Sequence, residues 1–158
     1  MQYEELIINA ESEGIEVIEN SCIGKLKGLC VDNIITINSN IKTSSEKICV
    51  LAEELGHYRT TYGNILDQSK VENRKQERRA RAWAYERLVN LASLIEASKQ
   101  GIRNRHELAE FLGVSEKFIE EAIRYYKDKH GIYYEIDNYI IYFEPLGVLE
   151  KYKEENDD

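Results

Sequence analysis

The chain has one proline, three cysteines and no long apolar run, and each of these shortages excludes some classes of protein. With only Pro145 and nine glycines, the sequence contains few hard breaks. No apolar run approaches the ~18 residues that a membrane helix needs. The cysteines, Cys22, Cys30 and Cys49, are odd in number and include no C-x-x-C pair, which predicts reduced thiols. The acidic start, with Glu4 and Glu5, argues against a secretory signal. We therefore expect a cytoplasmic protein without a membrane segment.

Positive charge is also scarce. Lysine and arginine number 21 against 29 acidic residues, which gives a formal net charge of −8 and no general attraction for nucleic acid. The 42% hydrophobic and 32% charged residues indicate a folded globular chain. A length of 158 residues predicts one domain, or one domain with a small appendage.

Residues 48–58 read as an amphipathic helix. Thr43 and Glu46 have the spacing of a capping box, so we expect the helix to begin near residue 44. Its apolar positions recur at i, i+3, i+4 and i+7 and comprise Ile48, Leu51, Ala52 and Leu55.

The polar face of this helix carries a possible metal-binding pattern. Glu53 and His57 lie one turn apart, and Glu54 lies beside them. This is the layout of the zinc-protease motif H-E-x-x-H, with Glu53 in place of the first histidine. Zinc accepts carboxylate oxygen as well as imidazole nitrogen, so Glu53 could be a ligand. The alternative is an acidic pair on a solvated helix face.

Two segments resemble the ImmA/IrrE metallopeptidases. L-A-E-E-L-G-H-Y at residues 51–58 resembles that family's H-E-L-G-H motif, and residues 77–84 resemble its E-x-x-A-x-x-F-A segment, with Trp83 replacing phenylalanine. The resemblance extends over roughly residues 1–95. It implies an α+β fold of zincin-like helices with a small β-sheet. It also implies a Zn²⁺ ion held by Glu53, His57 and Glu77, with Glu54 as general base.

The third ligand has competing interpretations. Glu77 heads a helical stripe of otherwise small and apolar residues, where a carboxylate is costly unless it is paired or bound to a metal. It could instead be solvated in the first helical turn or pair with Arg81. Asp67 is a rival ligand, because His57-x5-Gly63-x3-Asp67 resembles the extended motifs of other zinc proteases.

The first part of the chain also predicts a small sheet. We expect a helix over residues 2–13, a strand over 15–18, and a hairpin of strands 28–31 and 34–37 joined by Asp32-Asn33. Residues 34–38 could form an edge strand to which an extended peptide substrate adds. A plain hairpin that shields the core is the alternative.

The second part reads as a helix-turn-helix followed by a hairpin. A helix over about 74–98 ends before Gly101, Asn104 caps the next helix, Gly113 makes the turn, and a further helix runs from Ser115 to about residue 129. Strands 132–136 and 139–143 follow. We predict a zincin-like metallopeptidase domain over 1–98, a winged-helix-like module over 99–145 and an acidic tail over 146–158.

The charges of this module argue against DNA binding. Seven basic and seven acidic residues balance between Glu96 and His130, and Glu116, Glu120 and Glu121 lie on the helix that would read DNA. A structural or protein-docking role fits better. The family resemblance implies a zinc endopeptidase that cleaves a helix-turn-helix repressor of a phage or mobile element. The alternatives are an inactive relative that binds the repressor without cutting it, and a DNA-binding regulator.

Overall fold

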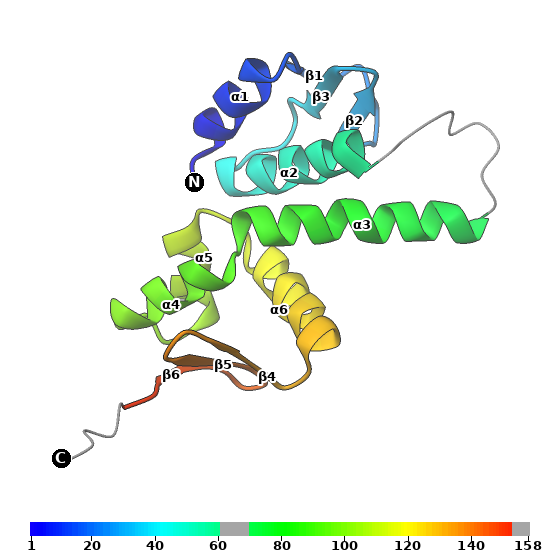
Figure 1. Cartoon of the computed structure of the whole chain (residues 1–158). Helices are drawn as coiled ribbons and strands as arrows, with labels where there is room; N and C mark the ends of the chain where they lie inside the picture. The colour runs from blue at the N-terminus through cyan, green and yellow to red at the C-terminus, as the bar shows by residue number, and fades with distance from the viewer. Residues whose placement is uncertain (61–69, 153–158) are drawn as a thin grey trace.

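The computed structural model describes residues 1–60 and 70–152, and it has the predicted mixed α+β architecture (Figure 1). Its first part comprises α1 (Tyr3–Ser12), β1 (Glu16–Asn20), β2 (Gly28–Val31), β3 (Ile34–Asn38) and α2 (Ser44–Thr60). Its second part comprises α3 (Lys70–Leu88), α4 (Leu91–Lys99), α5 (Arg105–Leu112), α6 (Glu116–His130), β4 (Tyr133–Ile136), β5 (Tyr139–Phe143) and β6 (Leu146–Glu150). No helix among the described residues has the length and apolar content needed to cross a bilayer.

The first sheet has the strand order β1-β3-β2, with β1 parallel and β2 antiparallel to β3. The predicted hairpin is confirmed, and Asp32 at its turn adopts the left-handed backbone with φ of 53°. The prediction of an edge strand at residues 34–38 is wrong, because β3 lies in the centre of the sheet. Ile35 and Ile37 on β3 are fully buried, which favours the central position. The edges are β1 and β2.

Local capping signals set the helix ends. The Glu46 amide donates to Thr43 Oγ1 at 3.2 Å, and α2 begins at Ser44 as predicted. The helix expected over 74–98 is divided into α3 and α4. Asn90 caps α4 by accepting a hydrogen bond from the Ser93 amide at 2.8 Å, and this bond competes with continuation of α3.

The two helices predicted on either side of Gly113 and the second hairpin are also present. Gly113 ends α5 in the left-handed conformation with φ of 71°, and Ser115 caps α6. The second sheet has the order β4-β5-β6, all antiparallel. Its third strand, β6, occupies residues 146–150, which we expected in the acidic tail. Val148 on β6 pairs with the fully buried Ile141 on β5. Pairing with this apolar strand explains why residues 146–150 form a strand instead of a tail.

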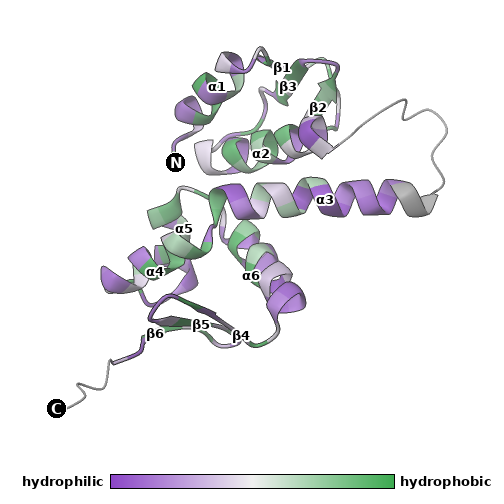
Figure 2. Ribbon diagram, in the orientation of Figure 1, coloured by the Kyte–Doolittle hydropathy of each residue, from purple (hydrophilic) through white to green (hydrophobic). Residues whose placement is uncertain are grey.

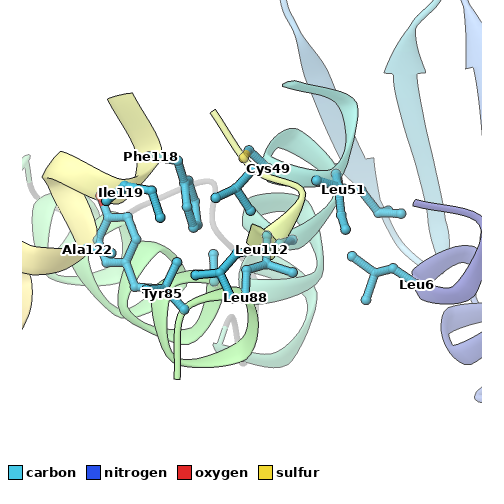
Figure 3. Close-up of a cluster of buried hydrophobic side chains, with 14 of the residues drawn as sticks. Leu6, Cys49, Leu51, Tyr85, Leu88, Leu112, Phe118, Ile119 and Ala122 are labelled. Atoms are coloured by element: carbon cyan, nitrogen blue, oxygen red, sulfur yellow. The ribbon is translucent and has the colours of Figure 1, made fainter. Parts of the chain in front are cut away.

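A single cluster of buried side chains runs through both parts of the chain. Figure 3 shows Leu51 of α2, Leu88 of α3 and Phe118 of α6 within it. In Figure 2, the coloured N-terminal part of α3 is mostly hydrophilic, and apolar residues appear toward its C-terminal end, where it meets the helices of the second part. Helix α3 therefore belongs to both halves of the core and holds the α2 face against α6.

Candidate metal centre

The candidate site depends on an unusually close contact between α2 and α3, which lie side by side (Figure 1). Gly56 is buried on α2 and faces Ala80 on α3. A Cβ atom on Gly56 would lie 2.2 Å from the carbonyl oxygen of Ala80, so only glycine fits. The two helices approach at the residue before His57, which brings their polar side chains within contact distance.

His57 and Glu77 meet across this contact. The distance from His57 Nε2 to Glu77 Oε1 is 3.4 Å, and the side chains are 27% and 51% exposed. Two donors bound to one tetrahedral zinc ion at ~2.0–2.1 Å lie about 3.4 Å apart. The pair predicted from the two sequence segments therefore has the separation of two ligands on one ion. Glu77 faces His57 across the helices rather than pairing with Arg81 on its own helix.

Glu54 lies against the edge strand β2. A Cβ atom on Gly28 would come within 2.7 Å of Val50 Cγ1 and 2.9 Å of Glu54 Cγ, so the missing side chain at residue 28 makes room for Glu54. Burial, together with the negative charges of Glu53 and Glu77, raises the pKa of Glu54 to about 7. A carboxyl group with a pKa near neutrality can both accept and release a proton during a reaction.

Glu53 contacts Arg81 and does not line the pocket that contains His57 and Glu77. Its Oε1 is 3.9 Å from Arg81 Nε, one turn beyond Glu77 on α3. Burial raises the pKa of Glu53, while the Arg81 guanidinium lowers it. Among the described residues, no three histidine, cysteine or acidic side chains are gathered closely enough to hold a metal ion. Asp67, the rival ligand, lies outside the described residues.

A pocket of about 650 Å³ opens between β2, α2 and α3. It contains three of the four predicted side chains, Glu54, His57 and Glu77, but not Glu53. Sequence reasoning missed most of the remaining wall, which includes Gly28, Cys30, Asp32, Asn73 and Gln76. Asn73 lies one helical turn before Glu77, so helical spacing from Glu77 is the signal that could have found it.

Comparison with protein families agrees with the motifs. The Peptidase M78 model, described as the IrrE N-terminal-like domain, matches residues 10–124. The chain belongs to this family. Comparisons with curated proteins and with solved structures give no match. Peptidase M78 is a family of zinc metallopeptidases, and its match covers α2, α3 and the helices up to most of α6, whereas the sheet β4-β5-β6 lies beyond it.

Two side chains of this M78 chain, His57 and Glu77, are placed as ligands of one zinc ion would be. Imidazole nitrogen and carboxylate oxygen are both zinc ligands, and the 3.4 Å separation of His57 and Glu77 suits one ion. Glu53 is on the same face of α2, one turn before His57, but it contacts Arg81. The assignment of Glu53, His57 and Glu77 as ligands and of Glu54 as general base stays a prediction. The observed geometry joins His57 to Glu77 and places Glu54 in the same pocket.

Proposed function

We propose that the protein is a zinc-dependent endopeptidase whose site is the pocket between β2, α2 and α3. The observation that carries this proposal is the 3.4 Å approach of His57 Nε2 to Glu77 Oε1, beside the half-buried Glu54. These groups come from two helices that the Gly56–Ala80 contact holds together. Membership of the M78 family supports the same reaction class.

His57 and Glu77 would hold the ion, and Glu53 would supply the third donor after separating from Arg81. Glu53 and Arg81 are both partly exposed, so their contact contributes little stability and can be exchanged for another partner. The ion supplies Lewis-acid activation of water and of the scissile carbonyl. Glu54 takes a proton from the attacking water and delivers it to the leaving amine. Its raised pKa suits both transfers.

The substrate would be an extended peptide segment placed along β2. This strand is an edge of its sheet, and Leu29 and Cys30 of β2 line the pocket beside Glu54. Backbone hydrogen bonds to an edge strand position a peptide without demanding a particular sequence. From the family resemblance we propose a helix-turn-helix repressor of a phage or mobile element as the protein substrate, cleaved in the cytoplasm to relieve repression.

Zinc content tests this proposal. Elemental analysis of the purified protein after equilibration with zinc chloride at neutral pH should give one zinc per chain. The His57→Ala and Glu77→Ala variants should each lose it, while Asn73→Ala, a change in the same pocket wall, should retain it. Absence of zinc from the wild-type protein would refute the enzyme proposal. Cleavage of co-expressed candidate repressors, followed by mass spectrometry, then identifies the substrate.

The contact between Glu53 and Arg81 favours a second candidate, an inactive M78 protein that binds a repressor without cutting it. A guanidinium beside Glu53 neutralises the carboxylate without a metal ion. A carboxylate in place of imidazole would also make bound water less acidic, because it adds negative charge at the ion. This candidate predicts repressor binding that persists without zinc and no cleavage with zinc.

The segment from α5 to β6 would be a winged-helix-like module with a structural or docking role. One face of α6 packs on α3, where Tyr85 lies against Phe118 with ring centroids 5.2 Å apart. The exposed residues at the start of α6 include Glu116 and Glu120, which repel phosphates. Salt-dependent binding to duplex DNA would contradict this assignment and favour a DNA-binding regulator.

A further inference from the structure

A second pocket, separate from the candidate metal centre, opens in the C-terminal half of the molecule. Its volume is about 470 Å³, within the range of ligand-binding pockets. Its walls come from α4, the α4–α5 connection, α5, α6, β5 and β6. The strands lie beyond the segment that matches the M78 family, so one wall of this pocket is not part of the matched domain.

The floor of this second pocket is apolar. It is formed by Leu94, Leu108, Ile119 and Phe143, each no more than 4% exposed. Ile123 and Val148, which are half-buried, extend the apolar surface toward the opening. A ligand that fills this space would gain free energy by removing apolar surface from water.

The rim is basic although the chain as a whole is acidic. Arg103, Arg105, Arg124 and Lys127 line the pocket, against two acidic side chains, Glu120 and Glu144. Both acids are already engaged, because Arg105 pairs with Glu120 and Lys127 pairs with Glu144. Within the described part of the chain, neither Arg103 nor Arg124 forms an ion pair. Two guanidinium groups are therefore available beside an apolar floor.

We propose that this pocket binds a small amphipathic carboxylate, with its apolar body on the floor and its carboxylate group at Arg103 and Arg124. A guanidinium binds a carboxylate through two parallel hydrogen bonds, which gives both affinity and orientation. A cation of the same size would meet an excess of positive charge at the rim. A neutral molecule would leave the two arginines without a partner. This site is independent of the proposed peptidase activity.

Isothermal titration of the full chain with octanoate, octylamine and octanol tests the proposal, because the three probes share a chain length and differ in charge. Octanoate should bind one per chain, and octylamine and octanol should each bind at least about tenfold more weakly, the effect of one lost charge-assisted contact. Methyl resonances of Leu108, Ile123 and Val148 should shift as octanoate is added. Equal binding of octanoate and octylamine, or shifts elsewhere, would overturn the proposal.

Paired variants test the role of the arginines. The double variant Arg103→Gln/Arg124→Gln should weaken octanoate binding by about tenfold or more. Arg79→Gln, the same change at an exposed arginine of α3 outside this pocket, should leave it unchanged. Circular dichroism melting checks that the variants fold. If the double variant does not fold, Arg103→Lys/Arg124→Lys keeps the charge, and loss of bidentate contact alone should weaken binding. Full octanoate affinity in a folded double variant would refute the site.

Discussion

The two pockets of this molecule are opposite in charge. Of the residues that the structure describes, those lining the pocket between β2, α2 and α3 include Asp32, Glu54 and Glu77 and no lysine or arginine. The pocket among α4, α5, α6 and the second sheet has four basic residues and two paired acids. The first environment attracts a cation and the second an anion. In a chain of net charge −8, the basic pocket stands out from the general charge more than the acidic one does.

The two pockets also differ in their relation to the matched family segment. The acidic pocket lies within the segment matched to Peptidase M78, and its proposed chemistry follows from side chains at motif positions. The basic pocket is completed by strands beyond that match. A change in one pocket should leave ligand binding in the other unaltered, because separate sites without shared partners contribute additively.

The largest effect should come from Glu54→Gln. Loss of a general base lowers the rate by ~10²–10⁴-fold, so repressor cleavage should nearly cease while the fold is kept. Single-turnover cleavage measured by gel or mass spectrometry gives the rate. Zinc content and octanoate affinity should both match the wild type. Cleavage within a few-fold of wild type would remove Glu54 from the mechanism.

His57→Ala should have the next largest effect. Substitution of a residue that hydrogen-bonds a metal ligand lowers metal affinity by ~10–100-fold. Loss of the ligand itself should therefore lower zinc affinity by more than about 100-fold. Competition with a fluorescent zinc chelator measures this affinity. Octanoate binding serves as the internal control and should not change. Unaltered zinc affinity would show that the ion binds elsewhere, and a parallel loss of octanoate binding would show that the pockets are coupled.

Gly56→Ala should destabilise the acidic pocket specifically. The added methyl group would clash with the Ala80 backbone. Overpacking of this kind lowers the free energy of unfolding by about 1–3 kcal/mol, because the helices must move apart. Separation of α2 from α3 should also weaken zinc binding. Gly147→Ala on β6 is the matched control, since a Cβ there meets nothing within 4 Å, and its effect should stay within about 0.5 kcal/mol. Urea denaturation measures both. Equal stabilities would contradict the close contact.

Local signals in the sequence predicted much of the fold. Thr43, Asn104 and Ser115 each accept a hydrogen bond from a backbone amide at the start of a helix, and Asp32 and Asp137 make the predicted hairpin turns with positive φ. The division of α3 from α4 was missed because the apolar stripe continues across the break. The position of β3 was missed because the parallel partner β1 is recognised only through long-range pairing.

The candidate site was also only partly predictable from the sequence. The motifs paired His57 with Glu77, and the structure brings these residues together because Gly56 allows the helices to meet. The contact of Glu53 with Arg81 was not predicted. Helical spacing makes Arg81 an i+4 partner of Glu77, and whether it contacts Glu77 or Glu53 depends on how α3 crosses α2. Such a choice is set by tertiary packing and leaves no pattern in the local sequence.

The smallest effect should come from Arg81→Gln, which tests whether Arg81 competes with the metal ion for Glu53. The side chains of Arg81 and Glu53 are 57% and 36% exposed, so their contact is worth no more than about 1 kcal/mol. Its removal should raise zinc affinity by up to about fivefold, measured by chelator competition. Arg79→Gln removes the same charge two residues earlier without touching Glu53, and should change the affinity less. A fall in zinc affinity in Arg81→Gln would mean that Arg81 positions Glu53 for the ion, because removal of a competitor would raise the zinc affinity.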